Sequence, residues 1–168
     1  MSDKDASLTQ SLLREFLDYN TETGDFYWKV NRTNIKAGTP AGTTTANGYL
    51  VIRLFRKLYL AHRLAWLYMH DDPMPRMLDH KNGNKRDNRI NNLRPANKVT
   101  NGQNRHAAQA NNKSSGLLGV AWLSHVNKFT AYINSNGTRT YLGLFADKHE
   151  AHAAYLTAKR KLHQGCTI

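Results

Sequence analysis

The chain has 168 residues, of which 40% are hydrophobic, so it has room for one ordinary domain or two small ones. It contains no run of about 18 apolar residues, and its first residues are acidic and unlike a secretory or transit leader, so we expect a cytoplasmic protein. Its single cysteine, Cys166, excludes a disulfide framework and a cysteine-based zinc site within one chain. The formal net charge of +12 at pH 7 favours a polyanionic partner, with nucleic acid as the leading candidate, although charge alone does not separate DNA from acidic membranes.

Apolar periodicity and turn residues predict the elements of the N-terminal part. The spacing of leucine and phenylalanine predicts a packing helix over residues 6–18, and an aromatic run predicts a short strand over residues 25–30. Residues 31–48 are rich in Gly, Thr and Asn and are expected to form an irregular loop. An antiparallel pair of strands and a helix are expected next, over residues 49–55, 57–61 and 62–70.

Positive charge is concentrated in the middle of the chain. Residues 25–108 hold 15 Lys or Arg against 5 Asp or Glu, whereas a surface selected for solubility would interleave both signs. Arg53, Arg56 and Lys57 belong to the predicted strand pair, and we expect them to contact DNA. His62 begins the following helix and is interpreted as a buried structural histidine rather than a metal ligand.

A second group of elements follows two prolines that end this helix. The pattern predicts a short strand over residues 77–81, a polar turn over residues 82–84, a further segment over residues 87–94 and a helix over residues 98–109. Asn97 is a good N-cap for that helix, because its side chain can accept a hydrogen bond from the first turn.

The C-terminal part has the pattern of a separate small domain. A polar segment, residues 111–116, is the predicted linker, and the domain behind it spans residues 117–168. Its turn signals, including Ser135-Asn136-Gly137, predict a three-stranded antiparallel sheet packed on one helix. The strands and the helix are expected over residues 118–124, 128–134, 138–145 and 147–163.

Asp79, His80 and Asn101 carry the chemistry that the sequence predicts. Phosphodiester hydrolysis needs a base that takes a proton from water, and positive charge near the leaving oxygen. His80 is the candidate base, whereas the carboxylate of Asp79 and the amide oxygen of Asn101 are hard ligands that suit Mg²⁺ or Mn²⁺. Neighbouring side chains on a strand face opposite ways, so Asp79 and His80 would not crowd one ligand shell. In the alternative interpretation, these residues are ordinary turn and cap residues.

Three sequence segments, residues 78–84, 87–94 and 101–104, resemble the HNH motif of phage and intron-encoded homing endonucleases. The resemblance implies an α+β fold with a ββα-metal (His-Me finger) core over residues 77–109. The endonuclease domain that contains this core would span residues 1–110, including the N-terminal helix and the β-rich lead-in.

The resemblance also implies a role for each motif residue. His80 would be the general base, Asn92 would complete the catalytic set by bracing the loop between the strands, and Asp79 and Asn101 would bind the divalent metal. We expect further DNA contacts from the basic residues around the motif, which are Lys85, Arg86, Arg89, Arg94 and Arg105.

The C-terminal part, from about residue 115 to 165, resembles the APETALA-type (ethylene-response-factor) DNA-binding domain. Its matching segments include Gly119-Val120-Ala121-Trp122 and Tyr141-Leu142-Gly143-Leu144-Phe145. In that family the sheet enters the major groove of DNA. The resemblance therefore makes five residues of this sheet candidates for DNA contacts, namely Trp122, Lys128, Tyr132, Arg139 and Tyr141. Phe129 stands where the plant domains usually have Trp.

The sequence thus predicts a site-preferring DNA endonuclease that hydrolyses phosphodiester bonds with one divalent metal ion, Mg²⁺ or Mn²⁺. We expect a monomeric phage homing endonuclease that acts on double-stranded DNA in the host cytoplasm, with no membrane partner and no small-molecule substrate. A DNA-binding regulator with a catalytically inactive HNH unit is the main alternative. An RNA-binding or structural protein is the third, and it leaves Asp79, His80 and Asn101 unexplained.

Overall fold

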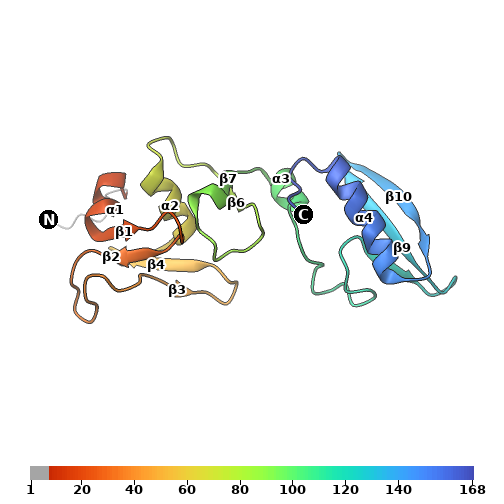
Figure 1. Cartoon of the computed structure of the whole chain (residues 1–168), viewed down its shortest axis with the longest axis horizontal. Helices are drawn as coiled ribbons and strands as arrows, with labels where there is room; N and C mark the ends of the chain where they lie inside the picture. Colours follow the sequence, from red (N-terminus) through yellow and green to blue (C-terminus); the bar gives the residue numbers. More distant parts are fainter. Residues whose placement is uncertain (1–7) are drawn as a thin grey trace. The chain divides into compact units, whose positions relative to one another are not determined.

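The computed structural model describes residues 8–168, and the chain divides into two compact units, one ending at Ala96 and the other beginning at Asn97. Short helices and small antiparallel sheets make up both units (Figure 1), so the predicted α+β character is confirmed. Within the described residues, no helix is long and apolar enough to cross a membrane. The domain bounds expected from the sequence, with a linker over residues 111–116, stay predictions.

The described part of the first unit combines three small sheets with short helices. Strand β1 pairs with β2, β3 pairs with β4 and β4 with β5, and β6 pairs with β7, all antiparallel. The elements are α1 (Gln10–Phe16), β1 (Leu17–Tyr19), β2 (Phe26–Trp28), β3 (Thr43–Thr44), β4 (Leu50–Leu54), β5 (Lys57–Leu60), α2 (Ala61–Met69), β6 (Leu78–His80), the 3-10 helix η1 (Ile90–Asn92) and β7 (Leu93–Pro95).

The helix expected over residues 6–18 is shorter than predicted. Its first two residues lie outside the described part of the chain, and the hydroxyl of Thr9 caps α1 by accepting from the backbone N–H of Leu12. The chain leaves the helix at Leu17 and enters strand β1, where Leu17 pairs with Trp28 of β2. A buried leucine satisfies both a helical and a strand pattern, so the apolar spacing alone did not indicate this change.

The predicted antiparallel pair over residues 49–61 is confirmed as the hairpin of β4 and β5. Leu54 pairs with Lys57, so Phe55 and Arg56 form a two-residue connection, and both have positive φ angles, 47° and 65°. Positive φ at both positions is the backbone geometry that matches the twist of a hairpin. The turn therefore exposes Arg56 at the tip.

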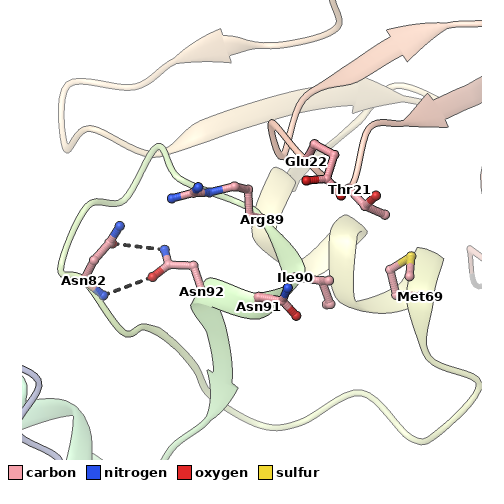
Figure 2. A pocket seen from close by; sticks show the side chains of 8 residues that line it. All are labelled: Thr21, Glu22, Met69, Asn82, Arg89, Ile90, Asn91 and Asn92. Carbon is pink, nitrogen blue, oxygen red and sulfur yellow. Dashed lines mark hydrogen bonds between the residues drawn. The ribbon is translucent and has the colours of Figure 1, made fainter.

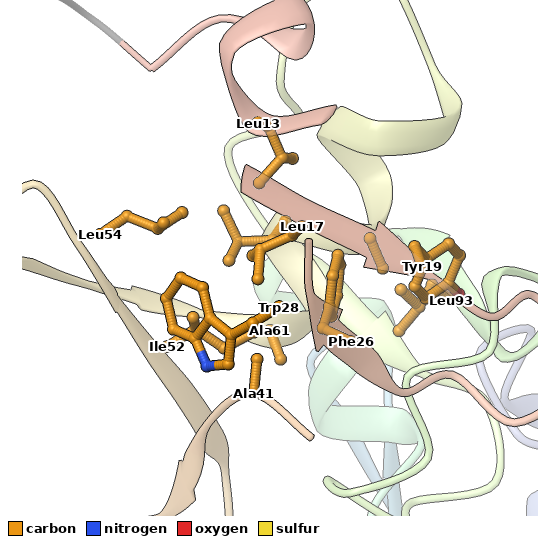
Figure 3. Packing of buried hydrophobic residues seen from close by; sticks show 12 residues of the cluster. Leu13, Leu17, Tyr19, Phe26, Trp28, Ala41, Ile52, Leu54, Ala61 and Leu93 are labelled. Atoms are coloured by element: carbon orange, nitrogen blue, oxygen red, sulfur yellow. The ribbon is translucent and has the colours of Figure 1, made fainter. Parts of the chain in front are cut away.

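A single hydrophobic cluster joins the sheets and helices of the first unit. Figure 3 shows the side chains of this cluster between the small sheets and α2, with Leu93 of β7 among them. The buried members are Leu13, Leu17, Tyr19, Phe26, Trp28, Ala41, Ile52, Leu54, Ala61, Leu64, Ala65 and Leu93.

His62 on α2 is buried beside this cluster, as the sequence predicted. Its side chain is only 6% exposed, and its ring lies 5.6 Å from the ring of Tyr49, measured between centroids. The Nδ1 atom has no hydrogen-bond partner among the described residues. Burial, followed by the neighbouring charges of His80 and Arg63, lowers the pKa of His62 to about 4, so the ring is neutral at physiological pH.

The second unit contains a three-stranded sheet packed on one helix. The strand order is β10-β9-β8, both pairings are antiparallel, and α4 covers one face of the sheet. Val120, Ala131 and Ile133 form the core together with Ala151 and Tyr155 of the helix. The elements are α3 (Lys98–Gln103), β8 (Val120–Leu123), β9 (Lys128–Ser135), β10 (Thr138–Phe145) and α4 (Lys148–Leu162). The predicted strands and helix are confirmed, but this architecture alone does not show the ethylene-response-factor-like family.

Helix α3 is shorter than the segment 98–109 expected from the sequence. Its start is as predicted, because the side chain of Asn97 accepts from the backbone N–H of Thr100 in a capping box. The helix ends at Gln103 for two physical reasons. Gly102 is a poor helix former, and none of the residues of α3 is buried, so no apolar face extends the helix further.

We predict that His62 makes the stability of the first unit depend on pH. Between pH 6.5 and 4 the unfolded chain holds a proton on His62 that the folded chain lacks, so stability is complete above about 6.5 and falls as the pH is lowered. The difference in pKa corresponds to roughly 3 kcal/mol. Urea denaturation at pH 7 and pH 4, followed by tryptophan fluorescence, should show that His62→Phe and His62→Asn lose less stability on acidification than the parent. Equal losses in all three chains would exclude this role.

Candidate active site

Strands β6 and β7 bring together the residues that the sequence singled out. Asp79 pairs with Arg94 across the two strands, and His80 pairs with Leu93. The chain between them, residues 81–92, forms a loop that returns to the same pair. All three residues of β6 are buried, so the site is partly shielded from water.

The carboxylate of Asp79 forms a cross-strand ion pair. Both Nε and Nη2 of Arg94 donate to Oδ2 of Asp79, at 3.1 Å and 2.9 Å. A buried carboxylate is costly unless a cation compensates it, and Arg94 supplies that positive charge. Arg94 was predicted to contact DNA, but in this structure it is engaged with Asp79.

The imidazole of His80 is held in one orientation by Asn88. Nε2 of His80 lies 3.2 Å from Oδ1 of Asn88, and Nδ2 of Asn88 donates to the carbonyl oxygen of Arg86 at 3.2 Å. Only the amide nitrogen of Asn88 can donate to that carbonyl, so its oxygen must face His80. An amide oxygen only accepts, and therefore Nε2 carries the ring proton. This assignment leaves Nδ1 as the basic nitrogen of the neutral ring.

Two other rings pack against His80 and contribute to its burial. The ring of His62 lies at 5.0 Å and that of Tyr49 at 6.1 Å, measured between centroids. Burial lowers the pKa of His80 below its ordinary value, although the hydrogen bond that its ring donates to Asn88 and the charges of Asp79 and Asp87 act in the opposite direction. His80 is consequently neutral at physiological pH, which is the state a general base requires.

Asn88 is anchored as firmly as the histidine it contacts. Asn88 is 1% exposed, and its backbone carbonyl oxygen accepts a hydrogen bond of 2.8 Å from the Tyr19 hydroxyl. A Cβ atom at Gly24 would lie 2.4 Å from the backbone nitrogen of Arg89 and 2.7 Å from the carbonyl carbon of Asn88, so only glycine permits this close approach. Asn88 was not among the site residues predicted from the sequence, although it lies within the motif segment 87–94.

Asn92 braces the loop between the two strands. Its Oδ1 accepts from the backbone N–H of Asn82 at 3.0 Å, and its Nδ2 donates to Oδ1 of Asn82 at 3.0 Å and to the carbonyl oxygen of Asp87 at 2.7 Å. Figure 2 shows the paired bonds between Asn82 and Asn92 beside a cavity of about 590 Å³. This geometry is what the resemblance implied for Asn92, whereas its place in the catalytic set stays a prediction.

The predicted DNA-binding residues of the first unit differ in their surroundings. Nζ of Lys85 donates to the carbonyl oxygen of Asn47 at 3.0 Å and lies 4.8 Å from the ring centre of Tyr49. Arg89 donates to both carboxylate oxygens of Asp87, at 2.7 Å and 2.6 Å. The remaining candidates have exposed side chains, and they are Arg53, Arg56, Lys57 and Arg86.

The residues present fit a hard divalent ion with an incomplete protein shell. Among residues 8–168 there is no group of three or more His, Cys, Asp or Glu that could hold a metal ion. Asp79 is a buried carboxylate whose Oδ2 already accepts from Arg94, so a metal ion would share this carboxylate with a guanidinium. Water and substrate phosphate commonly complete the shell of Mg²⁺. Asn101, like Arg105, is exposed in the second unit, so its pairing with Asp79 around one ion stays a prediction.

The sheet of the second unit has two different faces. Tyr132 pairs with Tyr141 on the face away from α4, and the guanidinium of Arg139 lies 4.0 Å from the ring centre of Tyr132. By strand alternation, Lys128 belongs to this same face. Trp122 does not, because it pairs with Phe129, which packs against the core on the other face.

Comparisons with known proteins add one finding to this geometry. No curated protein and no solved structure was matched. A family model described as HNH endonuclease matches residues 59–103, from the end of β5 to the end of α3. The matched segment contains Asp79, His80, Asn92 and Asn101, and it supports assigning this part of the chain to the HNH nucleases.

Proposed function

We propose that the protein is a metal-dependent endonuclease that hydrolyses phosphodiester bonds in double-stranded DNA, with His80 as the general base. The observation that carries the proposal is the hydrogen bond from Nε2 of His80 to Asn88, in a segment that matches the HNH endonuclease model. A buried, neutral imidazole whose second nitrogen is basic is the group that proton abstraction from water needs.

The proposed reaction uses the two nitrogens of His80 differently. Nδ1 takes a proton from the attacking water as its oxygen bonds to phosphorus, and the bond from phosphorus to the leaving oxygen breaks. The imidazolium that forms keeps its Nε2–H bonded to Asn88 and is stabilised by the negative charges of Asp79 and Asp87. The leaving oxygen takes its proton from solvent.

We assign the metal to Asp79 and Asn101, with Mg²⁺ or Mn²⁺ as the ion. When bound, the ion would stabilise negative charge on the phosphate and the leaving oxygen. Arg94 holds the carboxylate of Asp79 in place from the neighbouring strand, and the loop braced by Asn92 keeps the two strands in register. These residues therefore orient the site before substrate binds.

The second unit is proposed to give the enzyme its site preference. Lys128, Tyr132, Arg139 and Tyr141 share the face of the sheet that α4 leaves uncovered, and Tyr141 is 53% exposed. Aromatic rings and a guanidinium on one sheet face suit the floor and edges of a DNA groove. This supports a site-preferring enzyme, and a phage homing endonuclease is the proposed biological role.

One experiment separates the proposal from its alternatives. Supercoiled plasmid, and DNA that surrounds the protein's own gene, would be incubated with the intact chain and Mg²⁺ or Mn²⁺, with strand-resolved mapping of any cut. Metal-dependent cutting at preferred positions supports the endonuclease. Tight DNA binding without cutting would favour a regulator with an inactive HNH unit, and preferential RNA binding without cutting would favour an RNA-binding protein.

We predict that His80→Ala removes most cleavage but leaves DNA binding nearly intact. A positioned base contributes on the order of 10²- to 10⁴-fold in rate, so single-turnover nicking at saturating metal should fall by that factor. Raising Mn²⁺ should partly rescue Asn101→Ala, which loses a neutral ligand, but it should not rescue His80→Ala. A rate for His80→Ala within about threefold of the parent would mean that another group activates the water.

We predict that Asn88 controls the pH dependence of cleavage. The neutral ring of His80 is the active form and burial lowers its pKa, so the rate should rise with pH and reach half its plateau below about 6.5. Asn88→Leu removes a bond that favours the charged ring, which should move the midpoint to lower pH, whereas Asn88→Asp should move it to higher pH. Asn91→Leu, an exposed residue of the same loop, is the control. Coincident pH profiles for all four chains would contradict the assignment.

We predict that Arg139→Gln weakens DNA binding and makes it less sensitive to salt. Losing one phosphate contact should reduce the slope of log affinity against log salt concentration by about 1. Lys161→Gln removes the same charge from the exposed surface of α4 and is the control. Fluorescence anisotropy at several salt concentrations measures both variants. If they weaken binding equally, the uncovered sheet face has no special part in it.

A further inference from the structure

Helix α3, which carries Asn101, cannot be stable by itself. It has six residues, none of them is buried, and its most apolar residue, Val99, is 61% exposed. Isolated helices of this length are not stable in water, and most helix stability in proteins comes from packing of an apolar face. An N-cap of the kind that Asn97 provides typically stabilises a helix by about 1 kcal/mol. Other contacts must therefore hold α3.

The end of the chain supplies polar contacts of that kind. The backbone N–H of Gly165 donates to Oε1 of Gln103, the last residue of α3, at 3.0 Å. The hydroxyl of Thr167 donates to Oδ1 of the buried Asn104 at 2.7 Å, and Nε2 of His106 lies 3.1 Å from the same hydroxyl oxygen. These bonds join the C-terminal tail, residues 163–168, to α3 and to the residues that follow it.

Close packing adds to these bonds. Gly165 is buried against the backbone of α3, and a Cβ atom there would lie 2.4 Å from the carbonyl oxygen of Thr100. No side chain larger than hydrogen fits without a shift of the tail or of α3. Lys159 of α4 is 1% exposed and its Nζ donates to the carbonyl oxygen of Arg105.

We infer that the C-terminal tail is a clamp that positions α3 and thereby Asn101, with Gly165 and Thr167 as positioning residues. The tail lies about sixty residues beyond the end of the segment that matches the HNH endonuclease model. The contacts that carry the inference all belong to the second unit. The consequence for the reaction rests on the proposed function, which makes Asn101 a metal ligand.

Gly165→Ala in the full-length chain is the principal test. Hydrogen exchange without metal or DNA should show lost protection at the amides of Asn101 and Asn104, which donate within α3 to Asn97 and Thr100. Partners that orient a metal ligand typically affect metal affinity 10- to 100-fold, so half-saturation of nicking by Mn²⁺ should require on the order of tenfold more metal. The plateau rate and the affinity for DNA should stay close to the parent, which a general loss of structure would not allow.

Thr167→Val is a gentler variant that keeps the protein folded. It preserves the size of the side chain but removes the hydroxyl bonded to Asn104 and His106, so it should raise the Mn²⁺ requirement in the same direction as Gly165→Ala. Thr157→Val is the matched control, because that hydroxyl donates only to the carbonyl oxygen of Ala153 within α4. The control should match the parent in exchange and in its Mn²⁺ requirement.

The outcomes separate the clamp from the proposed function. Unchanged α3 protection in both tail variants would overturn the clamp, and so would lost protection with an unchanged Mn²⁺ requirement, since α3 would then move without consequence for the site. If the parent chain nicks no DNA with Mn²⁺, the proposed function fails, and hydrogen exchange alone still decides whether the tail holds α3.

Discussion

The hydrogen bond between His80 and Asn88 is the interaction on which the candidate site depends. It fixes the ring orientation and the position of the ring proton, and so it decides which nitrogen can accept a proton. Much of the first unit supports Asn88: the Tyr19 hydroxyl holds its backbone from β1, and Gly24 permits the turn before β2 to approach it. The small sheets that precede the HNH segment therefore support the loop that carries Asn88.

Electrostatics in the site follows from burial. Asp79 and His80 are neighbours on one strand, and both are buried. The two residues respond differently, because Arg94 compensates the carboxylate while the imidazole loses its proton. The strand therefore carries a paired carboxylate next to a neutral imidazole. A metal ligand and a general base need that combination at the same pH.

The sequence predicted the parts of the site better than their arrangement. Asp79, His80 and Asn92 were identified because their spacing matches a motif, and the β4–β5 hairpin followed from local patterns. Asn88 was missed because its role depends on a contact eight residues back with His80, which no local pattern reports. The predicted length of α3 was wrong, because where this helix ends depends on packing that no local pattern reports.

The packing of α3 with the tail also limits how such proteins can exchange modules. A chimera joined within residues 111–116 would pair the α3 of one parent with the α4 and tail of the other, and a side chain at position 165 would meet the backbone of Thr100. A joint between Ala96 and Asn97 keeps the helix with its own tail. Functional chimeras should therefore be obtained more readily with a joint before Asn101, the last residue of the HNH motif, than with a joint in the polar segment 111–116.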